Sequence, residues 1–326
     1  MNASISTIRL LGALCAVLVV TATHAADNYP TKPIKLVVGL SAGGTGDASA
    51  RALAAVAGKN LGQKIIVDNK PGASATIAAE IVAKSRPDGY TLLYGRNIEL
   101  ALAPAMGQQI AYDPARSFVP VTGLSISYYG LFVSPSLGVK TLAEFIALAK
   151  AKPGAISYGS FGNASLPHFL AYLFCKKLGL EMNHVPYKGE APATTDMLGG
   201  HIQVLFAVPA VILSHVKAGK LVPLMAAAPK RFVSLPNIPT AQESGIKGLE
   251  FAVWSGILAP ARTPRDIIVK LNAAFVKARN SPEVMTLPGA EDSGNLAGTP
   301  EAFAAFMKAE RERGVKLVKA SGIKLE

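Results

Sequence analysis

Cysteine is scarce in this chain, because its 326 residues include only Cys15 and Cys175. Cys15 lies in an N-terminal segment that we expect to be removed, which excludes an intrachain disulfide in the remaining protein. Stability must then come from a hydrophobic core, and a chain that is 50% apolar has ample material for one. Cys175 lies on the apolar stripe of an expected helix and is interpreted as a small buried side chain.

A long apolar run occurs only at residues 10–20, and no second one follows. Arg9 precedes the run, and Thr23 and Ala25 place small residues where a signal peptidase reads. We therefore predict that residues 1–25 are a secretory signal peptide and that the protein is periplasmic, a retained membrane anchor being the alternative. About 300 residues remain, enough for two domains of typical size.

Acidic residues are also few, 21 against 33 Lys and Arg, so the formal net charge is +12. The basic residues are scattered, and the densest group, Lys230-Arg231, has no aromatic residues interleaved with it. This pattern is typical of a solvated basic surface, and no nucleic acid partner is predicted. A diffuse positive field would favour the collection of anionic solutes.

The residue patterns of common enzymes are missing. No nucleophile elbow is predicted, although Gly39-Leu40-Ser41-Ala42-Gly43 has the Gly-x-Ser-x-Gly spacing, and Ser165 with His168 one helical turn later lacks an orienting acid. His184, His201 and His215 are scattered, without the paired spacing of metal ligands. The sequence therefore predicts neither an enzyme nor a metal site nor a cofactor.

What the chain does contain is a regular alternation of strand and helix patterns, which predicts an α/β fold with mostly parallel sheets. Strands are expected at Ile34–Val38, 64–68, 90–94, 156–158, 184–187, 202–206 and 221–226, and helices at 47–60, 73–84, Leu142–Ala151, 167–178, 192–198, 264–278 and 300–320. Two further apolar stretches, 129–133 and 251–258, are interpreted as crossovers between two lobes.

Three small polar loops follow strands, at residues 41–47, 159–165 and 188–192. In an open α/β sheet, ligands bind beyond the carboxyl ends of strands, where such loops gather. The first loop is rich in glycine and precedes a helix, so its backbone N–H groups suit a small anion such as a carboxylate, an ordinary tight connection being the alternative. It lacks the dinucleotide and P-loop motifs. Asp47 is expected to cap that helix and pair with Arg51.

Several motifs in order along the chain resemble the Bug proteins, the periplasmic solute receptors of tripartite tricarboxylate transporters (TctC). They are YPTKPIKLVV at 29–38, Ala42-Gly43-Gly44 with Asp47 and Arg51, DNKPGA at 68–73, AKSRPDGYTL at 83–92, HVPYKG at 184–189, Leu198-Gly199-Gly200 and Leu258-Ala259-Pro260. The resemblance covers nearly the whole chain after residue 25.

The resemblance implies a type II-like periplasmic-binding-protein fold, with two lobes of sheet flanked by helices that close on a ligand like a Venus flytrap. Lobe 1 would be discontinuous, comprising residues 26–127 and 255–326, and lobe 2 would comprise 128–254. It further implies a monomer that binds a small organic acid and delivers it to the membrane subunits of the transporter. An exported ligand-sensing partner of a membrane signalling receptor is the alternative.

Residues from both lobes are expected to line the cleft, which is predicted to hold no cofactor. They are Ser41, Ala42, Gly43, Gly44, Thr45, Gly46, Asn97, Ser160, Phe161, Asn163, Ala164, Ser165, Tyr187, Glu190 and Val208.

Some positions depart from the family pattern, notably Arg96-Asn97 where small hydroxyl residues are usual, and Glu190 where a small residue is usual. We hypothesise that Glu190 accepts an ammonium or another donor from the ligand. The alternative is that Glu190 faces solvent and pairs with Lys188.

Overall fold

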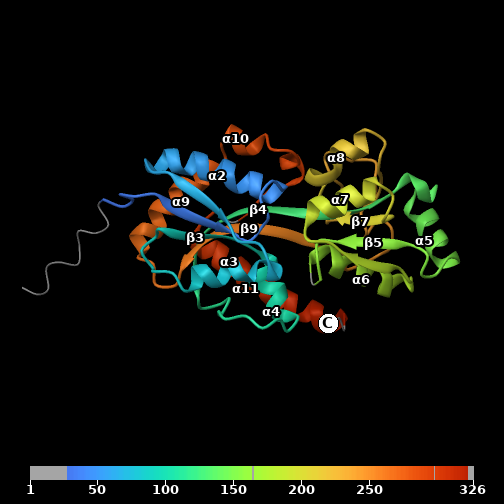
Figure 1. Ribbon diagram of the computed structural model, residues 1–326, viewed down its shortest axis with the longest axis horizontal. Coiled ribbons are helices and arrows are strands. Elements are labelled where there is room, and N and C mark those ends of the chain that lie inside the picture. The colour runs from blue at the N-terminus through green and yellow to red at the C-terminus, as the bar shows by residue number, and fades with distance from the viewer. Residues whose placement is uncertain (1–27, 164, 297, 322–326) are drawn as a thin grey trace, which may run out of the picture.

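The computed structural model describes residues 28–163, 165–296 and 298–321. Within these residues ten strands form one sheet. Eight of them neighbour one another in the order β2-β1-β3-β9-β4-β7-β5-β6, and β8 and β10 pair with β4 off this path. Figure 1 shows two groups of elements side by side, connected by the long strands β4 and β9. The predicted signal peptide lies outside the described residues.

The first lobe is built around the start of the chain and its end. Its strands are β1 (Ile34–Val38), β2 (Ile65–Asn69), β3 (Thr91–Arg96) and β10 (Gly294–Asn295). Its helices are α2 (Thr45–Leu61), α3 (Thr76–Ala83), α4 (Ala103–Ala105), α9 (Arg265–Arg279), α10 (Pro282–Met285) and α11 (Pro300–Ser321), with short helical turns at Ala73–Ala75, Ile98–Leu102 and Ala290–Asp292.

The second lobe contains the middle of the chain. Its strands are β5 (Ser157–Ser160), β6 (Asn183–Pro186), β7 (Val204–Ala207) and β8 (Val222–Ala227). Its helices are α5 (Leu142–Ala151), α6 (Leu166–Leu178), α7 (Glu190–Leu198) and α8 (Pro209–Lys217), with a short turn at Pro135–Leu137. Helix α8 was not among the predicted elements.

Both lobes share β4 (Phe118–Val133) and β9 (Ala252–Pro260). The part of β4 from Phe118 to Tyr128 pairs with β9, and the part from Tyr129 to Val133 pairs with β7 and β8. The chain thus passes from the first lobe to the second along β4 and returns along β9. The lobe boundaries at 127/128 and 254/255 stay a prediction.

The expectation of mostly parallel pairing holds only at the outer strands. β1 pairs in parallel with β2 and β3, and β5 with β6 and β7, whereas β9 runs antiparallel to β3 and β4. The reason is topological, because two strands that carry the chain between the lobes in opposite directions must lie antiparallel when they are neighbours.

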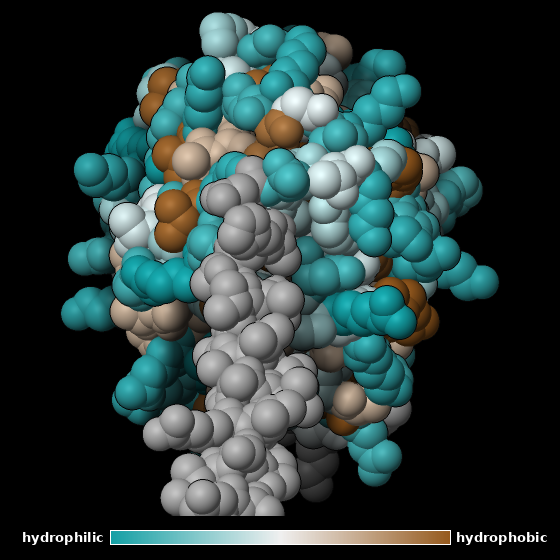
Figure 2. All heavy atoms as spheres, turned by 90° about the vertical axis from the view of Figure 1, so that its left-hand side faces the viewer, coloured by the Kyte–Doolittle hydropathy of each residue, from teal (hydrophilic) through white to brown (hydrophobic). Residues whose placement is uncertain are grey.

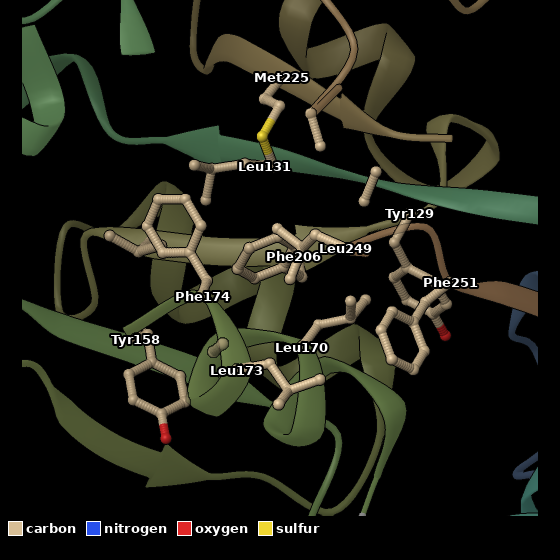
Figure 3. Close-up of a cluster of buried hydrophobic side chains, with 14 of the residues drawn as sticks. Tyr129, Leu131, Tyr158, Leu170, Leu173, Phe174, Phe206, Met225, Leu249 and Phe251 are labelled. Atoms are coloured by element: carbon tan, nitrogen blue, oxygen red, sulfur yellow. The ribbon is translucent and has the colours of Figure 1, made fainter. Parts of the chain in front are cut away.

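Each lobe has apolar clusters, and the main cluster of the second lobe also includes Leu102, Met106 and Val318 from the first. In the first lobe, one cluster under α2 and α9 includes Leu53 and Phe275, and another under α3 and α11 includes Trp254 and Phe303. In the second lobe, Phe174 and Phe206 pack edge to face with ring centroids 5.8 Å apart, and Leu131 and Met225 lie above them (Figure 3). These cores hold the loops at the strand ends in place.

The surface at one end of the first lobe is largely polar. Figure 2 looks at the end of the first lobe that lies on the left in Figure 1, where hydrophilic side chains dominate and apolar ones are scattered. Across the described ranges, the helices include none that is long and apolar enough to cross a membrane.

Candidate ligand-binding cleft

The loop that follows β1 opens helix α2 at Thr45, as the glycine-rich sequence predicts. Ser41, Ala42 and Gly43 are exposed, while Gly44, Thr45 and Gly46 are partly buried. Gly43 has a φ of +88°, a left-handed conformation that glycine adopts without strain. The first N–H groups of a helix have no intrahelical acceptor, so this corner presents donors at the positive end of α2.

Asp47 fixes the shape of this loop from inside. Its Oδ2 accepts hydrogen bonds from the Gly43 N–H and from Arg51 Nε, both at 2.9 Å, and its Oδ1 accepts one from Asn69 Nδ2 at 2.8 Å. Burial raises the pKa of Asp47, but these hydrogen bonds outweigh that effect and hold the pKa below its ordinary value. The predicted pairing with Arg51 is confirmed. The predicted cap by Asp47 is wrong, because Gly44 is the residue that precedes α2 and no side chain caps this helix.

A second loop follows β2 and packs against the first. This contact was not predicted from the sequence. Ala73, Ser74 and Ala75 all have positive φ, of 47°, 55° and 68°. A Cβ added to Gly39 would lie 2.4 Å from the Cβ of Ala75, so only glycine allows the two loops to touch. The motif around Pro71-Gly72 was the available signal, but a run of three left-handed residues without glycine has no simple sequence pattern.

The loop after β5 contributes the predicted residues of the second lobe. Ser160 is fully buried, and its hydroxyl donates to the Gly162 carbonyl at 3.0 Å and lies 2.7 Å from Nε2 of His184. Asn163 is exposed. Ser165 begins α6, and its buried Oγ has no hydrogen-bond partner among the described residues. Ser160 thus holds the loop in place, whereas the Ser165 hydroxyl is available; Ala164 lies outside the described residues.

Two stacked histidines, His168 and His184, lie next to this loop on its interior side. The rings of His168 and His184 stack with centroids 3.9 Å apart, and Tyr158 stacks on His184 at 5.0 Å. Burial and the neighbouring His168 lower the pKa of His184 to about 4. The Ser160 hydroxyl that His184 contacts is fully buried, so this pair faces the protein interior rather than a substrate.

Three further predicted residues form an apolar and aromatic wall. Phe161 and Val208 are partly buried and pack against the second-lobe core. Tyr187 donates a hydrogen bond from its hydroxyl to Asp196 Oδ2 at 2.7 Å. Burial together with Asp196 raises the pKa of Tyr187 to about 12. The Tyr187 hydroxyl is therefore engaged within its own lobe, and its ring is the part left for contact.

The two lobes meet at Thr45 and Glu190. The Thr45 hydroxyl donates to the Glu190 carboxylate, at 3.3 Å from Oε1 and 3.5 Å from Oε2. Glu190 is the first residue of α7 and is partly buried, whereas Lys188 is exposed and forms no ion pair with it. The solvent-facing interpretation of Glu190 is therefore wrong. A loop of one lobe thus touches the start of a helix of the other.

Arg96 acts on this contact between the lobes although it was not among the predicted residues. It ends β3, where it pairs with Ser255 of β9. Burial raises the pKa of Glu190, and the charge of Arg96 opposes that rise. Burial likewise raises the pKa of Tyr129 to about 12, again opposed by Arg96. Its departure from the family pattern was the signal that could have identified Arg96.

Asn97, the neighbour of Arg96, has a clear structural contact. It is 5% exposed, and its Nδ2 donates to the Ala252 carbonyl at 2.9 Å, which joins the end of β3 to the start of β9. Its role as a ligand contact stays a prediction.

A surface cavity of about 500 Å³ lies elsewhere in the first lobe. The Lys270 ammonium donates to the Tyr29 carbonyl there at 2.8 Å. The lining residues are Asn28, Tyr29, Pro30, Asn60, Leu61, Lys270, Ala273, Ala274 and Lys277. This cavity shares no lining residue with the lobe contact, and the chemistry described above gives it no role.

Comparison with known proteins identifies the class of this cleft. Residues 49–323 match the model of the tripartite tricarboxylate transporter family receptor. The protein BugT of Bordetella pertussis is 32% identical over 318 residues, covering 97% of this chain and 98% of BugT. The chain belongs to the tripartite tricarboxylate transporter receptor family. This confirms the resemblance seen in the sequence and the expectation of a solute receptor rather than an enzyme.

Solved structures confirm the two-lobed fold of this receptor. A protein of R. palustris solved with adipate has a TM-score of 0.85 and 32% identity, with coverage of 91% of this chain and 99% of that one. MatC from Rhodopseudomonas palustris, with bound malate, has a TM-score of 0.82 and 29% identity, with coverage of 89% and 100%. The periplasmic binding protein BugD has a TM-score of 0.85 at 29% identity, covering 91% of this receptor and 100% of BugD.

Proposed function

We propose that this chain is an exported, monomeric receptor that binds a small organic acid between its lobes and delivers it to the membrane subunits of a tripartite tricarboxylate-type transporter. The observation that carries the proposal is the hydrogen bond from Thr45 to Glu190, which joins the anion-binding loop of one lobe to the other lobe. Adipate and malate in related structures support a carboxylate as the ligand.

Binding would begin at the first lobe. A ligand carboxylate would accept hydrogen bonds from the Gly46 N–H, in the first turn of α2, and from the Ser41 hydroxyl. In this structure the backbone N–H and the hydroxyl of Thr45 are both engaged by the Glu190 carboxylate. Because Asp47 is satisfied by three protein donors, it holds the loop and does not compete for those groups. Neutral donors avoid the desolvation cost of a buried permanent counter-charge.

Closure would complete the site from the second lobe. The Ser165 hydroxyl, buried and without a partner among the described residues, would gain one from the ligand, with Asn163 beside it. Phe161, Tyr187 and Val208 would cover the apolar part of the acid. Closed and open arrangements would differ by movement about β4 and β9, the strands that connect the lobes.

The first test is a thermal-shift screen of the purified protein against carboxylic acids, each paired with its amide. A ligand at about one hundred times its Kd adds about 2.7 kcal/mol of stability, which gives a readable rise in Tm. We expect at least one acid to raise Tm while its amide does not. Equal shifts for acids and amides, or none across a broad panel, would contradict carboxylate binding.

A matched pair of variants then tests the cleft. Ser165 and Ser281 each precede a helix and each has a buried hydroxyl, but Ser281 lies at α10, near Glu283. Ser165→Ala should weaken binding of the identified acid about five-fold, the effect of one hydrogen bond, while Ser281→Ala leaves it unchanged. Equal effects would remove Ser165 from the site.

Uptake of the labelled acid by cells with and without the receptor gene tests delivery.

A further inference from the structure

A segment between α10 and β10 reaches from the first lobe to the second. It comprises residues 289–293, and we call it the inter-lobe strap. Before the strap, Val284 of α10 packs against the first-lobe cluster under α2 and α9. After it, β10 pairs with β4 at Ile126, and the Ser293 hydroxyl lies 2.6 Å from the Ser127 hydroxyl. The strap is thus anchored to the first lobe and runs along the strand that both lobes share.

Asp292 in the strap binds the second lobe through both oxygens of its carboxylate. Oδ1 accepts the Ser234 N–H at 3.1 Å, and Oδ2 accepts the Ser234 hydroxyl. Ser234 belongs to the second lobe, since Phe232 just before it is buried in a cluster with Ala226 of β8. Because the strap is anchored to the first lobe, these two hydrogen bonds join the lobes directly.

Gly289, at the other end of the strap, packs closely against α8. A Cβ added to Gly289 would lie 2.5 Å from the Ala210 Cβ and 2.6 Å from the Ala210 Cα, and the φ of Gly289 is +76°. Glycine is the residue that allows this approach and this backbone conformation. Ala210 lies in the first turn of α8, two residues after Val208, which is a predicted wall of the cleft. The strap therefore contacts the part of the second lobe that leads into the cleft.

The opposite face of the molecule joins the lobes through apolar packing. Leu102, Met106 and Val318 of the first lobe are members of the main cluster of the second. Separating the lobes there would expose apolar surface, at a cost of about 25 cal/mol per Å², whereas the strap would exchange hydrogen bonds to serine for hydrogen bonds to water. In Figure 1, α4 and α11 lie on one side of the shared strands, and α2, α7, α8 and α10 lie on the other. We therefore expect the lobes to part on the strap side, with the α11 side as the hinge.

We propose that the inter-lobe strap holds the two lobes together through the Asp292–Ser234 hydrogen bonds and the Gly289–Ala210 contact, and that it limits the rate at which a bound acid leaves. A contact that forms only when the lobes are together shifts the population toward that arrangement. Release requires this contact to break, whereas association with separated lobes does not, so the strap acts on the dissociation rate. The statement on release rests on the proposed function, and the statement on lobe separation does not.

Lobe separation is measured with one spin label on each lobe, in protein without added acid. Val269→Cys on α9 and Leu198→Cys on α7 supply the labelled positions, because both side chains are exposed, in a Cys175→Ala background. Pulsed electron paramagnetic resonance gives the distribution of distances between the labels. We expect Asp292→Ala, and independently Gly289→Ala, to increase the share of long distances relative to the unsubstituted strap.

Glu291→Ala is the matched control, because Glu291 is the neighbouring acid in the same strap and is exposed. It should leave the distances between the labels unchanged. Stopped-flow measurement with the acid that the thermal-shift screen identifies then gives the two rates. Release from Asp292→Ala should be about ten-fold faster, the effect of about two hydrogen bonds, while association changes by less than about two-fold.

The strap variants act at different residues, so misfolding of one leaves the other as the test. Label distances that stay as in the wild type in both Asp292→Ala and Gly289→Ala, or an equal shift in Glu291→Ala, would overturn the inference and leave the proposed function intact. Longer distances with an unchanged release rate would overturn the statement on release. Longer distances in both strap variants of a protein that binds no acid would support the strap and overturn the proposed function.

Discussion

Glu99 offers a sharp test of the energetics next to the cleft. It is 1% exposed and lies in the short helical turn Ile98–Leu102 after β3. Its Oε1 accepts the Arg96 N–H at 2.6 Å, while its Oε2 is buried without a partner among the described residues. Burial raises the pKa of Glu99 to about 8, although the charge and the N–H of Arg96 oppose this. The folded protein therefore holds a proton on Glu99 at neutral pH.

The sign of the effect on stability follows from proton counts. Between pH 4.5, the ordinary value for Glu, and pH 8, the folded state binds one proton more than the unfolded state. The free energy of unfolding must then fall as pH rises, by about 1.4 kcal/mol per pH unit from this group. Over the whole interval the ceiling is about 5 kcal/mol.

Glu99→Gln removes the titration and retains an amide oxygen for the Arg96 N–H. We expect the variant and the wild type to have similar stability near pH 4.5, with the variant gaining steadily up to pH 8 and the difference constant above it. Urea unfolding of both proteins at half-unit steps of pH measures the difference between their free energies of unfolding. The titration of all other groups is common to both proteins and cancels in this difference. A difference that does not change with pH, or a wild type that gains on the variant as pH rises, would refute the reasoning.

Three further perturbations have defined outcomes. Asp47→Ala removes the acceptor of the Gly43 N–H and should cost about 1–3 kcal/mol in urea unfolding, with weaker ligand binding; wild-type stability would contradict the role of Asp47. The pKa of His184, about 4, lies below its ordinary 6.5, so His184 contributes stability that is present above pH 6.5 and is lost as pH falls toward 4. The free energy of unfolding of His184→Gln should therefore fall less steeply than that of the wild type as pH decreases in the same titration. Parallel curves for the two proteins would refute this. Gly256→Ala should cost about 1–3 kcal/mol, because its Cβ would lie 2.2 Å from Phe303 Cζ, and an unchanged urea midpoint would contradict that packing.

Elements whose pattern is local were predictable from the sequence. The strand Ile34–Val38 and the helix Leu142–Ala151 have the bounds that were expected, since an apolar run and a Thr-x-x-Glu capping pattern both act within a few residues. The pairing of Asp47 with Arg51 was predictable for the same reason, because side chains four residues apart meet on one face of a helix. The family motifs added the two-lobed arrangement.

Side-chain orientation at the strand ends was not predictable. Both Ser160 and Ser165 were expected to donate to a ligand, yet only the structure shows that the Ser160 hydroxyl is occupied by His184 and Gly162. The stacking of His168 on His184 depends on a helix and a strand that pack together, and no spacing along the chain indicates it.

The sequence by itself determined the alternating strands and helices, the glycine-rich corner before α2 and the family of this receptor, because each follows from residues that are close along the chain. Only the tertiary structure decided that β4 and β9 run antiparallel between the lobes, and that Arg96 and Glu190 act at one site with Thr45. Those residues belong to different lobes, and their proximity depends on how the two lobes are joined. Charge and hydrogen bonding between them are therefore properties of the assembled fold.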